Sequence, residues 1–251
     1  MKVELINHTP MALETLLYTK NTRLQGGQSI EDIFAWPERK KLEHLDYMKD
    51  TIQSSWEFVD YTFKIEGVTR AFTHQLVRTR TGSYAQESQR TIDASDHEVI
   101  NTCQSDLGIE LFEVLASDLM GGYANMIEDG VPIQDARGIL PTNISTSIIC
   151  KFSLRTLHDM ALLRLCTRTQ GEYQRVFKLM RECVIEAHPW TEQFIKVHCA
   201  WYGSCAFPRY TDCPVKWDAR DTDKERKLAY ERNWDRVDHE ANPIAEGGKT
   251  Q

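Results

Sequence analysis

The chain has 251 residues, 41% of them hydrophobic, which is enough for a sizeable core in one large domain or two small ones. Its formal net charge of -7 argues against a general nucleic-acid or anionic-membrane binder, because such proteins bind phosphates through a basic face. We expect a cytoplasmic protein, since no apolar run approaches the roughly 18 residues of a membrane span and M-K-V-E-L-I-N-H lacks the apolar core of a secretory signal.

The first part of the chain mixes strand and helix patterns. Residues 3–8 alternate as a strand does, and Thr9 and Pro10 predict the N-cap and first turn of a helix. Residues 30–48 have helical spacing that is interrupted at Pro37. Aromatic and β-branched residues alternate after Trp56 and predict a strand that ends at Gly67. Helical spacing returns just before an arginine-rich loop.

The rest of the chain predicts further helices around a buried element. Residues 106–129 form one long amphipathic pattern, and a connection bounded by Gly and Pro follows over 130–141. Residues 145–166 are apolar on nearly every side and predict a buried element. From residue 216 onward, alternating charges predict a solvated helix followed by a disordered end. With no internal repeat, we expect one domain with an appendage.

The stretch H-Q-L-V-R-T-R-T-G-S-Y-A-Q-E-S-Q-R over 74–90 carries arginines but no lysine, and Glu87 is its only acid. The planar fork of the guanidinium group suits phosphate and carboxylate oxygens, whereas solvated surfaces usually mix signs and use lysine. Because the chain has no Gly-rich phosphate loop, an anion bound here would be held by side chains. The alternative is an exposed loop whose arginines are merely solvated.

A second candidate cation is Arg164. On a helix, positions 153, 157, 160 and 164 share one face, which places this arginine beside Leu157 and Met160. A buried guanidinium is costly unless it is paired, so Arg164 is either a structural ion-pair partner or a functional cation. Arg155 and Asp159, four positions apart, could form an ordinary surface pair.

The nucleophiles and metal ligands of the sequence give weaker signals. The seven cysteines do not suggest a disulfide framework, and four stand alone in apolar or helical surroundings as free buried thiols do: Cys103, Cys150, Cys166 and Cys183. We expect no metal, because the close C-x2–4-C pair of structural zinc sites is missing from the only candidate set: His198, Cys199, Cys205 and Cys213. Ser88 has no activating base near it in sequence and is expected to position a substrate.

Four motifs together resemble the flavin-dependent thymidylate synthases. The central motif of that family is R-H-R-x-x-S-x-[NS]-[EQ]-x-S-x-R, and residues 78–90 follow its frame. An N-terminal V-x-L-I-x-H-T-P, the connection A-R-x-x-L-P-x-N at 136–143 and the helix L-R-T-L-x5-L-R-L at 154–165 agree in the same order. Because the matches keep their order over residues 3–175, they argue against a chance resemblance.

The resemblance implies a nucleotide site and a flavin site, each holding a phosphorylated ligand. The residues that match the dUMP site are Gln75, Arg78, Gln86, Ser88, Arg90, Arg137 and Arg164. The residues that match the FAD site are Ser54, Arg78, Thr79, Arg80, Gln86, Ser153, Arg155 and Asp159. Arg164 is similar to the arginine that stabilises the uracil ring as N3 gives up its proton, so the resemblance gives this cation a catalytic role.

The implied enzyme is a homotetramer that uses FAD, NADPH and 5,10-methylenetetrahydrofolate to methylate dUMP at C5. Its single α+β catalytic domain, a sheet with flanking helices, would span 1–198, followed by a charged and partly disordered extension over 199–251. Thr79 and Ile52 replace two histidines of the family motifs. The product could therefore be a 5-hydroxymethyl nucleotide, and the substrate could be dCMP. A non-catalytic nucleotide or flavin binder is a third hypothesis, against which the retained arginines argue.

Overall fold

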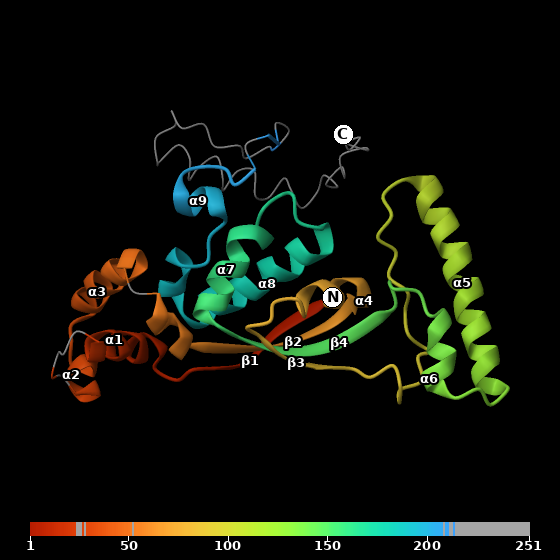
Figure 1. Ribbon diagram of the computed structural model, residues 1–251, viewed down its shortest axis with the longest axis horizontal. Helices are drawn as coiled ribbons and strands as arrows, with labels where there is room; N and C mark the ends of the chain where they lie inside the picture. Colours follow the sequence, from red (N-terminus) through yellow and green to blue (C-terminus); the bar gives the residue numbers. More distant parts are fainter. Residues whose placement is uncertain (24–26, 28, 52, 208, 211–212, 214–251) are drawn as a thin grey trace. The chain divides into compact units, whose positions relative to one another are not determined.

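A computed structural model describes residues 1–23, 27, 29–51, 53–207, 209–210 and 213. The chain divides into two compact units, Met1–Thr156 and Leu157–Gln251. Helices and one antiparallel sheet make up the described residues, which confirms the predicted α+β class (Figure 1). None of the helices described here combines the length and apolar character needed to cross a bilayer. The helix expected after residue 216 lies outside the described residues, and the boundary expected at 198 stays a prediction.

The sheet of the first unit has the strand order β1-β2-β4-β3, and every neighbouring pair is antiparallel. Its strands are β1 (Lys2–His8), β2 (Asp60–Thr69), β3 (Ser83–Gln86) and β4 (Ser145–Ser153). The two central strands are β2 and β4, which lie side by side although more than 70 residues of sequence separate them. The short strand β3 was predicted as loop, and it carries the arginine-rich segment to the sheet edge.

One face of the sheet is apolar and buried. Tyr61 and Phe63 of β2 lie opposite Phe152 and Cys150 of β4, and all four side chains are buried. The strand does not end at Gly67 as the sequence predicted. This glycine has φ +64° and sits within β2 where the register with β4 shifts, so it forms an irregularity inside the strand because glycine tolerates positive φ.

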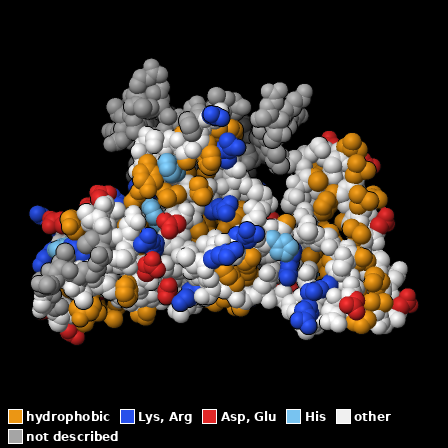
Figure 2. Space-filling view, viewed as in Figure 1, with side chains coloured by type: hydrophobic (Ala, Val, Ile, Leu, Met, Phe, Trp, Pro, Cys, Tyr) orange, Lys and Arg blue, Asp and Glu red, His pale blue; other side chains and the backbone are white. Residues whose placement is uncertain are grey.

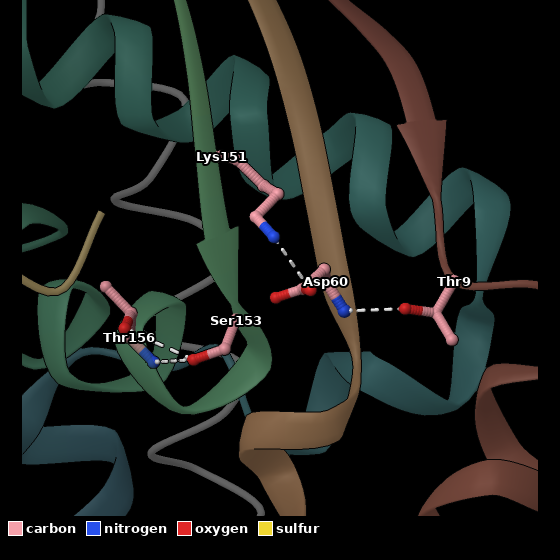
Figure 3. Close-up of polar contacts among 5 residues, drawn as sticks. All are labelled: Thr9, Asp60, Lys151, Ser153 and Thr156. Atoms are coloured by element: carbon pink, nitrogen blue, oxygen red, sulfur yellow. Dashed lines mark hydrogen bonds and ion pairs between the residues drawn. The ribbon is translucent and has the colours of Figure 1, made fainter. Parts of the chain in front are cut away.

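Four helical segments follow β1: α1 (Ala12–Arg23), α2 (Ile30–Phe34), α3 (Glu38–Thr51) and the 3₁₀ helix η1 (Ser54–Phe58). The break at Pro37 is confirmed between α2 and α3. The prediction that Thr9 caps α1 is wrong. Its hydroxyl instead accepts a hydrogen bond from the backbone N–H of Asp60 at 2.8 Å, and Met11, with φ +51°, separates it from the helix (Figure 3).

The remaining helices of the first unit are α4 (Arg70–Leu76), α5 (Asp106–Glu128), α6 (Ile133–Ala136) and the 3₁₀ helix η2 (Arg137–Ile139). The long helix predicted over 106–129 is confirmed, and the connection that follows it contains α6 and η2. Tyr123 of α5 packs in a small separate core, whose other buried members are Ala94, Ala136 and Ile144. This core fixes η2, and Arg137 with it, to the first unit.

The buried element predicted over 145–166 is two elements, because β4 ends at Ser153 and α7 (Leu154–Arg164) begins at the next residue. The second unit continues with α8 (Gly171–Ala187), η3 (Pro189–Gln193) and α9 (His198–Tyr202). All seven cysteines are free thiols. Cys103 was expected to be buried but is exposed, because it lies in the loop just before the Ser105 cap of α5.

Candidate functional site

Helix α4 and the turn after it hold the first group of predicted site residues. Thr69 caps the helix through its hydroxyl, which accepts a hydrogen bond from a first-turn backbone N–H at 3.0 Å. Gln75 lies in the last turn of the helix, and Arg78, Thr79 and Arg80 lie between α4 and β3. The sequence therefore places these residues together at the end of one short, well-capped helix.

The turn that carries them is held by contacts to its backbone. The Tyr84 hydroxyl lies 3.0 Å from the carbonyl oxygen of Leu76 and 2.6 Å from that of Thr79. The backbone N–H of Gly82 also donates to Thr79, at 3.0 Å. A Cβ atom on Gly82 would stand only 2.4 Å from Cε1 of the buried Phe152 ring, so only glycine fits here without a shift. The backbone below the arginines is thus fixed.

The guanidinium groups on this fixed backbone are not neutralised. Arg78, Arg80 and Arg90 are exposed, and among the described residues no carboxylate forms an ion pair with any of them. Lys151, which lies next to the same turn, is different because Asp60 pairs with it at 3.2 Å (Figure 3). The three arginines therefore remain available for an external anion, and their forked donors fit phosphate oxygens.

Beyond β3 the chain turns again and presents the second group of predicted residues. The side-chain amide of Gln86 donates to the Thr73 hydroxyl of α4 at 2.8 Å, which anchors the strand end. The Ser88 hydroxyl accepts a hydrogen bond from the backbone N–H of Arg90 at 3.2 Å, as in a serine turn. Ser88 thus shapes the loop that holds Arg90, and its expected contact with a substrate stays a prediction.

Arg137 joins this second group from a distant part of the sequence. Its Nε donates to the backbone carbonyl of Gln134 at 3.1 Å, and its side chain is half-buried. It lies near enough to Arg70 to affect that residue: burial lowers the pKa of Arg70, Glu87 raises it, and Arg137 lowers it. Arg70 was not predicted as a site residue. In the sequence, Arg70 is one more arginine at the start of the same helix. Helical periodicity alone does not distinguish such an arginine from an ordinary surface residue.

The expected flavin residues from the sheet and its flanks gather at one place in the first unit. Ser153 does not share a helix face with Arg164, because it is the last residue of β4; its hydroxyl accepts a hydrogen bond from Thr156 N–H at 3.2 Å and so caps α7 (Figure 3). Arg155 Nη1 lies 3.6 Å from Oε1 of Glu57, an exposed residue of η1. Ser54 is in the same 3₁₀ helix.

The expected residues lie at both ends of β3, and Arg78 and Gln86, which belong to both expected sets, stand at opposite ends of it. Ser83, the first residue of β3, pairs with Lys151 near the end of β4. This end of β3 is next to Arg80 and to the turn at Ser153. Gln86, at its end, pairs with Ile148 and leads to the Ser88 turn. At about 3.3 Å per residue, the two ends of this strand lie about 10 Å apart. The first unit therefore offers two neighbouring basic regions rather than a single one.

The second unit contributes Arg164 and Asp159. Arg164 lies in the last turn of α7, half-buried, with its guanidinium carbon 4.3 Å from the centre of the Tyr173 ring of α8. The side-chain amide of Gln174 donates to the carbonyl oxygens of Leu165 and Cys166, which holds the α7–α8 loop in place. Stacking uses the face of the guanidinium and leaves its in-plane N–H donors available. Asp159 is exposed on α7.

The cysteine- and histidine-containing segment after α8 shows no metal site. Within the part of the chain that the structure describes, no group of three or more His, Cys, Asp or Glu side chains is arranged to hold a metal ion. His198 Nδ1 instead lies 3.0 Å from the carbonyl oxygen of Ser204, and Cys205 Sγ accepts a hydrogen bond from Phe207 N–H at 3.3 Å. These contacts are local and stabilise the turn after α9.

Comparisons with known proteins agree with the motifs. A family model described as thymidylate synthase complementing protein matches residues 4–190. Three similar proteins bear the name flavin-dependent thymidylate synthase. The Sulfurisphaera tokodaii protein is 30% identical over 203 residues, 79% of each chain. The Pyrococcus horikoshii protein is 36% identical over 191 residues, 72% of this chain and 79% of its own. The Geobacter sulfurreducens protein is 34% identical over 185 residues, 68% of this chain and 77% of its own.

Proposed function

The chain belongs to the thymidylate synthase complementing protein family and is an enzyme of the flavin-dependent thymidylate synthase type, and on this premise we propose that it methylates dUMP at C5 to form dTMP. The one-carbon donor is 5,10-methylenetetrahydrofolate, and NADPH supplies the reducing equivalents. The chain spans most of the length of its curated relatives, so the proposal concerns a catalytic region comparable to theirs.

The observation that carries this proposal is the set of exposed, unpaired arginines on a fixed backbone. Arg78 and Arg80 stand at one end of β3, and Arg90 stands beyond the other. An enzyme that binds a nucleotide and a dinucleotide cofactor side by side needs cationic donors in two neighbouring regions. The spacing of about 10 Å along a strand of this length supports that arrangement.

The nucleotide residues act on different parts of dUMP. Arg90 and Arg137 offer charge to the phosphate, while Ser88 and Gln75 position the nucleotide by hydrogen bonds. Arg164 stabilises the pyrimidine ring as N3 gives up its proton, using the in-plane donors that stacking on Tyr173 leaves available. No covalent enzyme nucleophile is required.

The residues of the flavin region fit FAD because they offer cations and hydroxyls to an anionic pyrophosphate. Arg78, Arg80 and Arg155 supply the cations. Thr79 lies between the first two in sequence, and Ser54 belongs to η1, whose Glu57 pairs with Arg155. FAD, when bound, supplies the redox chemistry that the protein side chains cannot perform. The chain itself binds and orients the cofactor next to the nucleotide.

A homotetramer is part of the proposal because α5 exposes a long apolar stripe. Figure 2 shows hydrophobic side chains along this helix. The exposed members of the stripe are Leu107, Leu111, Val114, Leu115 and Leu119. A stripe of this length on a surface is typical of a subunit interface, since burial of each leucine against another subunit is favourable.

A different product remains a second candidate, because Thr79 stands where the family motif has a histidine. The backbone of Thr79 is held by the Tyr84 hydroxyl and by the Leu76 carbonyl. The test is incubation of the FAD-reconstituted protein with dUMP or dCMP and both cosubstrates, followed by product mass determination. We expect dTMP from dUMP. A product heavier by one oxygen would establish hydroxymethylation, and a folded protein that cannot be reconstituted with FAD would contradict the proposal.

A further inference from the structure

Arg70, at the first position of α4, contacts the loop that leads to the proposed nucleotide residues. Its Nη1 donates a hydrogen bond of 3.0 Å to the backbone carbonyl oxygen of Glu87. Glu87 lies directly before Ser88 and three residues before Arg90, whose backbone N–H donates a hydrogen bond to the Ser88 hydroxyl. A long, half-buried arginine thus holds the backbone where β3 ends and the nucleotide loop begins.

Three features make the position of Arg70 energetically unfavourable, although it gains a hydrogen bond to one carbonyl oxygen. Its Nε is buried and, among the described residues, meets no acceptor, which costs free energy. Arg137 lies near enough to repel it. The position at the start of a helix also disfavours a cation, because the N-terminal end carries partial positive charge.

The charges around Arg70 do not compensate these costs within the protein. Glu87 is the acid that acts on it favourably. Yet the Glu87 carboxylate also lies 3.5 Å from Nε2 of His97, so it is shared between two partners. Arg70 and Arg137 therefore bring two positive charges against the one carboxylate, that of Glu87, that acts favourably on Arg70. A bound anion beside Arg137 would correct that balance.

We propose that Arg70 is a positioning residue of the nucleotide site, which holds the Ser88–Arg90 loop through the Glu87 carbonyl and whose charge is balanced by the nucleotide phosphate. This inference rests on the function proposed above. The guanidinium need not touch the phosphate, because its hydrogen bond to the backbone already fixes the loop that does. Its contribution is therefore to nucleotide binding, and the flavin region at the other end of β3 is unaffected.

The experiment compares Arg70→Met and Arg70→Lys with the wild-type FAD-loaded protein in calorimetric titrations with dUMP and with deoxyuridine. Arg70→Met removes the donor and the charge, so we expect dUMP affinity to fall about tenfold or more, the scale of one charge-assisted hydrogen bond. Deoxyuridine lacks the phosphate, and its affinity should change much less. Arg70→Lys keeps the charge and a donor, and should recover part of the loss. FAD affinity should stay at the wild-type value in both variants.

A matched control is Arg39→Met, which removes an arginine whose side chain is 91% exposed and pairs only with Glu43 on the surface of α3. It should bind dUMP as the wild type does. Unchanged dUMP affinity in Arg70→Met would overturn the inference. An equal loss of dUMP and FAD binding in both Arg70 variants would also overturn it, because it would show that Arg70 only stabilises the fold. A wild-type protein that binds FAD but neither dUMP nor deoxyuridine would instead contradict the proposed function.

Discussion

Arg164 was predicted to lie on an apolar helix face, where burying a guanidinium costs free energy, and the fold accommodates it. Its helix neighbours Leu157 and Met160 are buried, at 1% and 5% exposure, as an apolar helix face requires. The guanidinium is neither fully buried nor left against aliphatic side chains, because it stacks on the Tyr173 ring. The structure places the cation on an aromatic ring, and its role as a functional cation stays a prediction.

We predict that Arg164→Ala lowers turnover of dUMP by about 100-fold or more, the usual scale for losing one group that stabilises developing charge. FAD should stay bound, because this residue belongs to the nucleotide set. Arg164→Lys should restore little activity, since a point charge cannot reproduce a planar stacked fork. The measurement is steady-state kinetics together with the flavin spectrum of each variant. Near-normal turnover in a folded Arg164→Ala protein would show that the arginine is structural.

At the level of single residues, the sequence identified residue type better than position. Arg78, Arg80 and Arg90 are exposed and carry no ion pair among the described residues, which is what both an anion site and a solvated loop predict. Ser153 was placed on a helix face, but it ends β4 and caps the helix, since a cap has the same sequence spacing as a helical residue. Arg70 was missed because its role depends on a contact across the α4–β3 turn.

At the level of elements, the turn between α4 and β3 is the feature on which the site depends. Two donors close it by hydrogen bonds to the Thr79 carbonyl oxygen: the side-chain hydroxyl of Tyr84 and the backbone N–H of Gly82. Because Gly82 approaches the Phe152 ring so closely, the turn cannot relax without disturbing the buried face of the sheet. The basic residues on either side of the turn are therefore held by the same core that stabilises the fold.

Gly82→Ala should destabilise the protein by about 1–3 kcal/mol, the usual cost of overpacking a core. The reason is that the new Cβ would stand 2.4 Å from the buried Phe152 ring and 2.7 Å from the Tyr84 hydroxyl. Urea denaturation would measure the change. Gly121→Ala is a suitable control, because nothing lies within 4 Å of its Cβ position and alanine favours a helix more than glycine does. A Gly82→Ala protein as stable as the control would contradict this view of the turn.

The elements that the sequence predicted well are those with long periodic patterns. The helix over 106–129 and the break at Pro37 agree with the structure because periodicity and proline act locally. Strand β3 has only four residues, S-Y-A-Q, with too few alternations to be recognised, and it forms because β4 offers an edge for pairing. Gly67 was interpreted as a strand end, since a glycine irregularity inside a strand gives the same signal.

At the level of the whole molecule, the apolar stripe of α5 is the feature that a single chain does not explain. Leu107 and Leu115 are 66% and 61% exposed, and such exposure is costly when it repeats along one helix that faces water. Association of α5 with other subunits would cover them, which is the basis of the proposed homotetramer.

Leu115→Glu should therefore dissociate the assembly while leaving each subunit folded. The side chain is exposed in the single chain, so the charge costs little there, but it would be buried without a partner in the interface. Analytical ultracentrifugation measures the change in mass. Ser117→Glu adds the same charge two positions further along α5, where the side chain points away from that of Leu115, and should weaken the assembly much less. An unchanged tetramer in Leu115→Glu would place the interface elsewhere.

We propose that this chain transfers a one-carbon unit to C5 of dUMP with a flavin cofactor. The most direct test is to supply 5,10-methylenetetrahydrofolate labelled with ¹³C in the methylene group, together with dUMP, NADPH and the FAD-loaded protein, and to record the carbon NMR spectrum of the nucleotide product. We predict that the label appears in the C5 methyl group of dTMP and that omission of FAD abolishes it. Recovery of unlabelled dUMP from folded, FAD-loaded protein would contradict the account.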